Sequence, residues 1–141
     1  MNKSFPLFLR ANLSLLHHKS RIDDFFKVAN KYPDVRVLVV ARGLDCAALV
    51  KIVKGVITVT DIRNKKEFFL KESLGYKGYV EASVRILMKI LYGFISNLKI
   101  IPLMLKGKIK IKGMRELLKF QKLVNVLIKK VERDRWKGRH F

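Results

Sequence analysis

The residue types that most often carry catalysis or bind metals are few in this sequence and poorly spaced for either role. Cys46 is the only cysteine, and it lies in the apolar run 46–50, where a buried, inert thiol is favoured over a nucleophile. The histidines have no metal-ligand spacing with this cysteine. Asp23 and Asp24 are adjacent carboxylates, but at the start of a helix they more simply offset its dipole.

Nucleotide-binding and hydrolase motifs are also missing from the sequence. It contains no G-x-G-x-x-G pattern, no P-loop and no G-x-S-x-G pattern, in which spacing alone would indicate a phosphate-binding turn or a nucleophile. The sequence therefore predicts no catalytic residue, no metal and no cofactor. We expect a protein that is not an enzyme.

Attraction of anions is the chemistry that the composition favours. The chain has 31 lysine and arginine residues against 11 aspartate and glutamate residues, a formal net charge of +20. Such a field attracts nucleic acid, membrane headgroups or acidic metabolites, and does not by itself choose among them. A nucleic-acid-binding protein is the alternative that the charge supports most directly, although the sequence has no helix-turn-helix, zinc-finger or RNA-recognition signature.

Part of this charge follows a regular pattern near the end of the chain. Isoleucines and lysines alternate between Gly107 and Gly113, which is the period of a strand with one buried and one solvated face. Directly after Gly113 the period changes to about 3.6 residues, and apolar residues recur at that spacing from Leu117 to Val131. The sequence thus predicts a strand that runs almost without a loop into a helix over 114–131.

The apolar sides of this strand and helix must both turn inward, which drives their lysines outward on neighbouring elements. A basic face of this kind suits an anionic bilayer, at about 1 kcal/mol per residue close to the headgroups. The simpler interpretation is a solvated coat that keeps the protein soluble. The predicted membrane-docking residues are Lys108, Lys110, Lys112, Lys119 and Lys122.

The strand, the glycine and the apolar helix resemble the last strand and last helix of the sterol carrier protein type two family, which are small lipid-binding domains. The segment 78–83, followed by another apolar helix, is similar to the preceding strand and helix of that family. The resemblance extends over about residues 79–127. It implies an apolar tunnel between a sheet and its helices, in which a lipid or another long apolar ligand binds.

Turn residues and β-branched runs predict the other elements. Lys54 and Gly55 separate two such runs and have the form of a hairpin turn, while Pro33 ends an amphipathic helix. The fold class is α/β (α+β), with a mixed, largely antiparallel sheet of about five strands packed against helices. The predicted helices cover 20–32, 84–98 and 114–131, and the predicted strands cover 35–41, 48–53, 56–62, 79–82 and 108–112, with 67–72 as an extension of the sheet.

The predicted helix over 84–98 is apolar around about 200° of its circumference, roughly twice the width that an ordinary surface helix needs. The extra surface has three explanations: packing against a neighbouring helix, a homodimer interface, or an internal cavity for an apolar ligand. A connector over 100–105, which Pro102 is expected to keep from being helical, would adjoin such a cavity. The residues predicted to line it are Leu87, Ile90, Leu91, Phe94, Ile101, Leu105, Leu117, Phe120, Val124 and Leu127.

The length of 141 residues fits a single domain over 1–141, with an N-terminal arm or short helix over 1–19 and a basic tail over 132–141. No signal peptide is recognisable, and charged residues interrupt the most apolar stretch, 84–105, which argues against a membrane span. We therefore expect a cytoplasmic protein. Abundant lysine with a single glutamine, Gln121, is typical of heat-adapted proteins.

Overall fold

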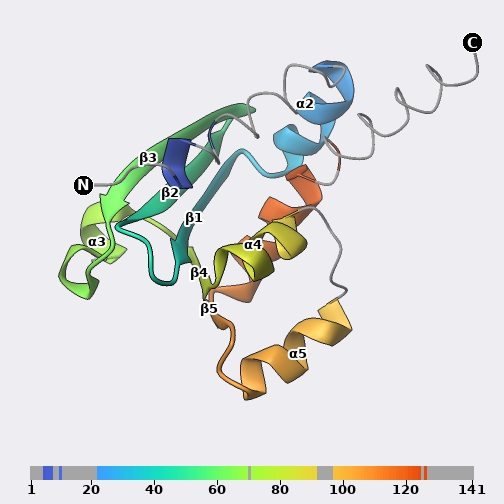
Figure 1. Cartoon of the computed structure of the whole chain (residues 1–141). Helices are drawn as coiled ribbons and strands as arrows, with labels where there is room; N and C mark the ends of the chain where they lie inside the picture. Colours follow the sequence, from blue (N-terminus) through green and yellow to red (C-terminus); the bar gives the residue numbers. More distant parts are fainter. Residues whose placement is uncertain are drawn as a thin grey trace, which may run out of the picture.

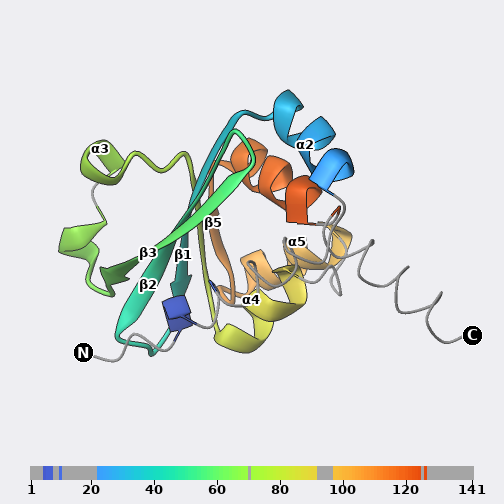
Figure 2. The same cartoon turned by 90° about the horizontal axis from the view of Figure 1, so that it is seen from above.

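A five-stranded sheet with the strand order β3-β2-β1-β4-β5 forms the centre of the molecule. The structure is a computed structural model, which describes residues 5–7, 10, 22–69, 71–91, 97–124 and 126. Helices α2, α4 and α5 and the C-terminal helix lie on one side of the sheet, which we call the inner side, and α3 lies on the other (Figures 1 and 2). The predicted α+β class is confirmed.

The first three strands form an antiparallel meander. They are β1 (Asp34–Ala41), β2 (Cys46–Val53) and β3 (Val56–Arg63). Val53 pairs with Val56 across the turn, so Lys54 and Gly55 form the predicted two-residue hairpin turn. All three strands extend the predicted ranges by one or two residues.

The last two strands complete the sheet from distant parts of the chain. Strand β4 (Gly78–Ala82) pairs in parallel with β1, and β5 (Lys110–Lys112) pairs antiparallel with β4. One parallel pair among antiparallel ones makes the sheet mixed and largely antiparallel, as predicted. β1 is therefore a central strand, and from Val37 to Ala41 every residue is buried.

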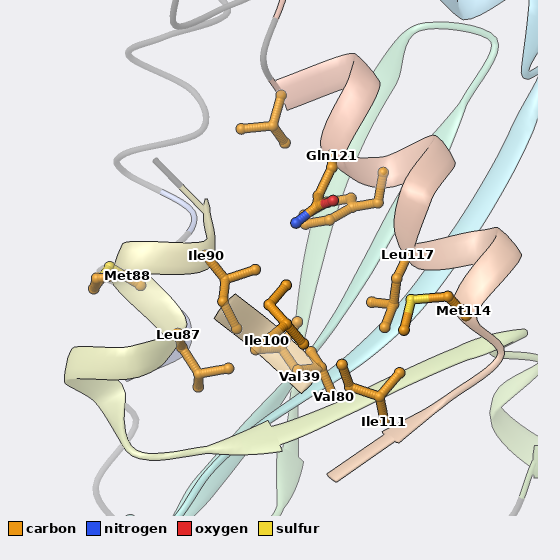
Figure 3. Close-up of a pocket in the computed structure, with 12 residues that line it drawn as sticks. Val39, Val80, Leu87, Met88, Ile90, Ile100, Ile111, Met114, Leu117 and Gln121 are labelled. Carbon is orange, nitrogen blue, oxygen red and sulfur yellow. The ribbon is translucent and has the colours of Figure 1, made fainter. Parts of the chain in front are cut away.

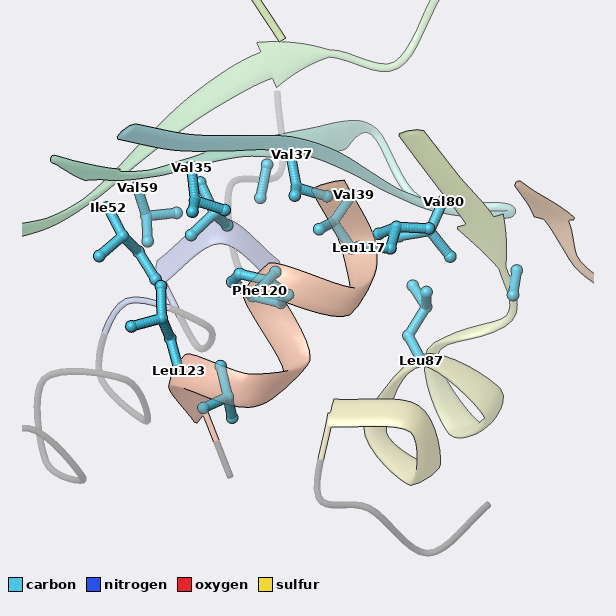
Figure 4. Close-up of a cluster of buried hydrophobic side chains, with 14 of the residues drawn as sticks. Val35, Val37, Val39, Ile52, Val59, Val80, Leu87, Leu117, Phe120 and Leu123 are labelled. Carbon is cyan, nitrogen blue, oxygen red and sulfur yellow. The ribbon is translucent and has the colours of Figure 1, made fainter. Parts of the chain in front are cut away.

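The larger helical segments that the structure describes on the inner side of the sheet come from three regions of the chain. They are α2 (Ile22–Lys31), α4 (Val84–Leu91), α5 (Asn97–Leu105) and the C-terminal helix, described over 114–124. Leu117, Phe120 and Leu123 of the C-terminal helix point toward the valines of the central strands (Figure 4). This apolar contact is the main core of the protein, because Val35, Val37 and Leu123 are fully buried in it.

A smaller apolar cluster lies on the outer side of the sheet. Leu38, Val40, Ala47, Leu49 and Tyr79 are buried there, and Phe69, Leu74 and Tyr76 pack against them. The covering segment contains a 3-10 helix, η1 (Lys66–Phe68), and the short helix α3 (Lys71–Leu74). The prediction that 67–72 extends the sheet was wrong, because these aromatic and apolar side chains cover the sheet face instead of lengthening its edge.

The region after β4 also differs from the prediction. The hydroxyl of Ser83 accepts a hydrogen bond from the Ile86 N–H at 3.3 Å, so Ser83 caps α4 as expected. Helix α4 is described to Leu91, residues 92–96 lie outside the described part of the chain, and Asn97 already belongs to α5. The predicted helix over 84–98 is therefore confirmed over Val84–Leu91, and its last two predicted residues belong to α5.

The prediction that Pro102 prevents helix formation over 100–105 was wrong. Pro102 lies inside α5, where it removes one backbone hydrogen bond, the one to the carbonyl of Leu98. The C-terminal end of α5 is capped. Gly107 adopts a φ of 73°, and the N–H groups of Gly107 and Lys108 donate to the carbonyls of Met104 and Leu103 at 3.0 and 2.9 Å, a glycine C-cap that satisfies the last turn.

Gly113 makes the sharp change from β5 to the C-terminal helix. Its φ is 69°, and its carbonyl accepts hydrogen bonds from the N–H groups of Glu116 and Leu117 at 3.1 and 3.3 Å. The helix therefore begins directly after the strand, as the change of period predicted. Residues 127–131 of the predicted helix lie outside the described part of the chain.

The N-terminal arm reaches the same core. Residues 5–7 are helical, and Phe5 is buried in the main apolar cluster. The guanidinium of Arg10 donates a hydrogen bond to the carbonyl of Val59. The remainder of the arm over 11–19 and the basic tail over 132–141 lie outside the described residues.

Candidate functional site

An apolar pocket lies between the inner side of the sheet and the helices α4, α5 and the C-terminal helix (Figure 3). Its volume is about 50 Å³. Every lining residue except Gln121 has an apolar side chain. The lining residues are Val39, Val80, Leu87, Met88, Ile90, Ile100, Ile111, Met114, Leu117, Phe120, Gln121 and Val124.

Three strands supply the floor of this pocket through the register of the sheet. Val39 of β1 lies opposite Val80 of β4, and Val80 lies opposite Ile111 of β5. Side chains at paired positions point to the same face of a sheet. These three residues therefore form an apolar strip across the strands, directed at the helices.

Residues at helical spacing on α4 and on the C-terminal helix form the walls of the pocket. Leu87 and Ile90 are three residues apart on α4, and Met114, Leu117, Gln121 and Val124 recur every three or four residues on the C-terminal helix, so each set lies on one side of its helix. Figure 3 shows the labelled residues of the two helices on opposite sides of the pocket, with Ile100 of α5 between them. The arrangement offers apolar surface and one amide, and it suits an apolar ligand.

Solved structures with a similar chain path identify the fold. A UbiJ-SCP2 ubiquinone synthesis protein superimposes with a TM-score of 0.61 over 90% of this chain and 95% of that chain, at 15% sequence identity. The chain has the sterol carrier protein type two fold. The predicted resemblance is thereby confirmed at the level of the fold.

Two further structures match less well. A stereoselective inverting sec-alkylsulfatase from Pseudomonas sp. has a TM-score of 0.49 and 18% identity, over 65% of this chain and 13% of that chain. A conserved hypothetical protein from Thermus thermophilus, described as possibly a sterol carrier protein, has a TM-score of 0.42 and 12% identity, over 74% and 77%. No protein-family model matches the sequence, and no curated protein does.

The sterol carrier protein type two fold brings five of the ten predicted cavity residues to the pocket: Leu87, Ile90, Leu117, Phe120 and Val124. The side chains of Leu91, Phe94 and Leu127 lie outside the described part of the structure.

The placement of Ile101 and Leu105 in the cavity was wrong, because they are 55% and 85% exposed and do not line the pocket. The reason is that the segment is helical. Ile100, 5% exposed, takes the inward position, and residues one and five places later on a helix turn away from it.

Seven residues that line the pocket were not predicted from the sequence. Val39, Val80 and Ile111 lie on strands, where alternation indicates an inner face but does not indicate which helix meets it. Met114 and Gln121 could have been found, because they lie three residues before and four residues after Leu117 on the same predicted helix. Met88 and Ile100 complete the set.

The predicted basic face divides into two groups. Lys110 and Lys112 lie opposite Glu81 and Tyr79 in the sheet register, so they project to its outer side, where the Lys112 ammonium lies 5.6 Å from the centre of the Tyr79 ring. On the C-terminal helix, the Lys122 ammonium donates to the Tyr32 hydroxyl at 3.3 Å. Lys108 is exposed just after α5.

Lys119 has a buried partner. Its ammonium lies 3.7 Å from a carboxylate oxygen of Glu116, which is 4% exposed and makes no hydrogen bond among the described residues. Glu116 lies in the first turn of the C-terminal helix, where a negative charge is favoured by the helix dipole. This charge belongs to the helix start and not to the pocket lining.

A polar network connects α5 to the sheet. The Arg42 guanidinium donates hydrogen bonds to the Glu81 carboxylate at 3.2 Å and to the Gly107 carbonyl at 2.8 Å. The Tyr79 hydroxyl donates to the same carboxylate at 2.9 Å, and burial together with this hydrogen bond raises the pKa of Tyr79 well above its ordinary value. The tyrosine is therefore neutral at physiological pH, and the end of α5 is fixed to β4.

Two features are absent from the part of the chain that the structure describes. It contains no group of three or more histidine, cysteine, aspartate or glutamate side chains that could hold a metal ion. In the same residues, no helix is both long and apolar enough to cross a membrane.

Proposed function

We propose that this protein binds a lipid or another long apolar ligand between its sheet and its helices, without catalysing a reaction, and carries it between membranes. The observation that supports this most is the lining of the pocket, in which Gln121 is the one polar side chain among the described residues. The sterol carrier protein type two fold adds support, since its name describes carriers of this kind. A polar head group of the ligand would find a hydrogen-bonding partner in the Gln121 amide.

Burial of hydrocarbon supplies the affinity in this proposal. Each buried CH₂ group contributes about 0.8 kcal/mol, so a long chain needs few polar contacts. The pocket volume of about 50 Å³ is well below the roughly 300–1,000 Å³ of typical ligand pockets. Loading therefore requires the lining side chains to move apart, for which the unbranched side chains of Met88 and Met114 are well suited.

The direct test is native mass spectrometry of protein purified without detergent, followed by displacement of a fluorescent fatty acid. Ile90 lines the pocket and Ile86 lies one turn earlier on α4, half-buried but outside the lining. Ile90→Gln is expected to weaken fatty-acid binding about tenfold, because an amide would be buried against apolar groups. Ile86→Gln is the matched control and should retain affinity. Absence of both co-purified lipid and displacement would disprove the proposal.

We also propose that the lysines around β5 attract the protein to anionic membranes. Replacing Lys108, Lys110 and Lys112 by glutamine is expected to weaken binding to anionic vesicles about 100-fold at low salt, from about 1 kcal/mol per charge. The difference should shrink as salt rises, since exposed charges are screened. Vesicle sedimentation measures both effects, and affinity for the fatty acid should not change.

The control for this experiment removes the same charge elsewhere. Lys51, Lys54 and Lys65 belong to β2, its turn and the segment after β3, away from the β5 edge of the sheet. Their replacement by glutamine should affect vesicle binding much less. Equal weakening by both triple variants would indicate a nonspecific effect of net charge, and no weakening would leave the lysines as a coat that keeps the protein soluble.

A further inference from the structure

Helix α5 presents apolar side chains to solvent on the side that faces away from the pocket. Ile101, Met104 and Leu105 are 55%, 36% and 85% exposed, whereas Ile100 on the other side is 5% exposed. Residues 100–105 contain no polar side chain. A helical segment that is apolar all round is normally buried, but no part of the chain that the structure describes covers the exposed side of residues 100–105.

The exposed apolar surface extends to a residue that lines the pocket. Met114 lines the pocket and is also 43% exposed, so this side chain lies between the pocket and the surface. Ile100 lines the same pocket from α5, next to the exposed Ile101. Helix α5 and the start of the C-terminal helix thus both line the pocket and carry exposed apolar side chains.

Positive charge surrounds this surface without any acidic counterpart in the local sequence. Lys106, Lys108 and Arg115 are exposed, and no acidic residue occurs between Glu81 and Glu116. A second copy of the chain would bring the same positive charge to the interface and be repelled. An anionic partner with an apolar interior complements both features.

We infer that α5 is a membrane-inserting helix, which lies in the interface of an anionic phospholipid bilayer and opens the pocket toward the acyl chains. Ile101 and Leu105 enter the apolar region, and Lys106 and Lys108 contact the headgroups. The role in ligand loading rests on the proposed lipid-binding function. Insertion itself does not depend on it.

The geometry of α5 suits this role better than it suits a protein partner. With nine residues at about 1.5 Å each, the helix is too short to cross a bilayer and fits the interface, where amphipathic helices enter by about 5–10 Å. Its exposed side chains are aliphatic, without the aromatic anchors that dominate protein interfaces. The glycine C-cap and the Arg42 contact to Gly107 hold the helix formed in advance, which reduces the entropic cost of docking.

A fluorescent label reports the position of α5 directly. Cys46 is fully buried, so a thiol-reactive nitrobenzoxadiazole dye will label Leu105→Cys selectively. Val56→Cys is the control, because Val56 is 60% exposed on β3, at the opposite edge of the sheet. With phosphatidylglycerol vesicles, the emission of the dye at position 105 should shift to the blue, and the dye at position 56 should be unaffected. Sedimentation with vesicles while the dye at position 105 stays in water would overturn the inference.

A double variant tests whether the apolar contact contributes to affinity. Ile101→Ser with Leu105→Ser is expected to reduce binding to these vesicles by at least about tenfold, since both side chains would otherwise leave water. Val56→Ser should not. Because positions 101 and 105 are exposed, the melting temperature and the affinity for fatty acid should be unchanged. Unchanged vesicle binding, or a wild-type protein that binds no vesicles, would overturn the inference.

Two outcomes separate the inference from the proposed function. If wild-type protein binds no fatty acid while the dye at position 105 enters the bilayer, the proposed function fails and insertion stands. If fatty acid binds and the dye does not enter, insertion fails alone. A dimer in analytical ultracentrifugation that the double variant dissociates would show that a second copy covers α5, and would also overturn the inference.

Discussion

Gly113→Ala is expected to lower the free energy of unfolding by about 3 kcal/mol or more, among the largest losses for any single methyl group added to this protein. The φ of 69° at Gly113 is in the left-handed region, which costs other residues about 1–2 kcal/mol. In addition, a Cβ atom would overlap the carbonyl oxygen of Lys77, an atom of the backbone just before β4. The backbone would have to shift where β5 joins the C-terminal helix, which supplies a wall of the pocket.

Gly107→Ala is the matched control for this prediction. Gly107 has a similar φ of 73°, but a Cβ atom there would meet no atom within 4 Å. Its substitution should cost only the conformational penalty, about 1–2 kcal/mol. Urea denaturation followed by circular dichroism measures both losses, and equal losses would contradict the importance of the Lys77 contact.

Phe120→Ala is expected to lower the free energy of unfolding by about 3–5 kcal/mol in the absence of ligand. Phe120 is 7% exposed and belongs both to the main core and to the pocket lining. Removing its ring leaves a space next to the pocket, which the surrounding structure fills only partly. A long apolar ligand can occupy this space, so fatty acid should raise the melting temperature of the variant more than that of the wild type.

Leu123→Ala is the control that distinguishes a loss of core packing from a change in the pocket. Leu123 is fully buried on the same helix but does not line the pocket, so its truncation should cost about 2–5 kcal/mol with no added response to ligand. Differential scanning calorimetry with and without fatty acid compares the two variants. An identical ligand response in both would show that Phe120 belongs to the core alone.

The strands were predictable where local sequence determined them. β1 and β2 are β-branched runs, and β5 alternates isoleucine with lysine, so their existence followed from composition and period. The 3-10 helix η1 and α3 were missed because Phe68 and Phe69 are typical of strands. Only packing against the outer side of the sheet, which is not local in sequence, assigned the segment to a different structure.

The candidate site was likewise predictable only in part. The residues that follow from a pattern within one segment could be predicted, and those that depend on pairing between distant segments could not. Leu117, Phe120 and Val124 followed from one helical period within a single segment. Val39 and Val80 required the parallel pairing of β1 with β4, which joins residues far apart in the chain. Pro102 led to a wrong expectation for α5, because a proline inside a helix removes only one hydrogen bond, while the glycine C-cap satisfies the last turn.

The strand order also determines when the pocket comes into existence during synthesis and folding. β3, β2 and β1 are joined by short turns and can pair early, whereas β4 must reach β1 across the whole meander, which makes its closure entropically slower. The inner valines of the meander that contact Leu117, Phe120 and Leu123 stay partly uncovered until the C-terminal helix forms. A nascent or truncated chain that ends before Gly113 would expose this surface, and we expect such fragments to aggregate or to bind chaperones.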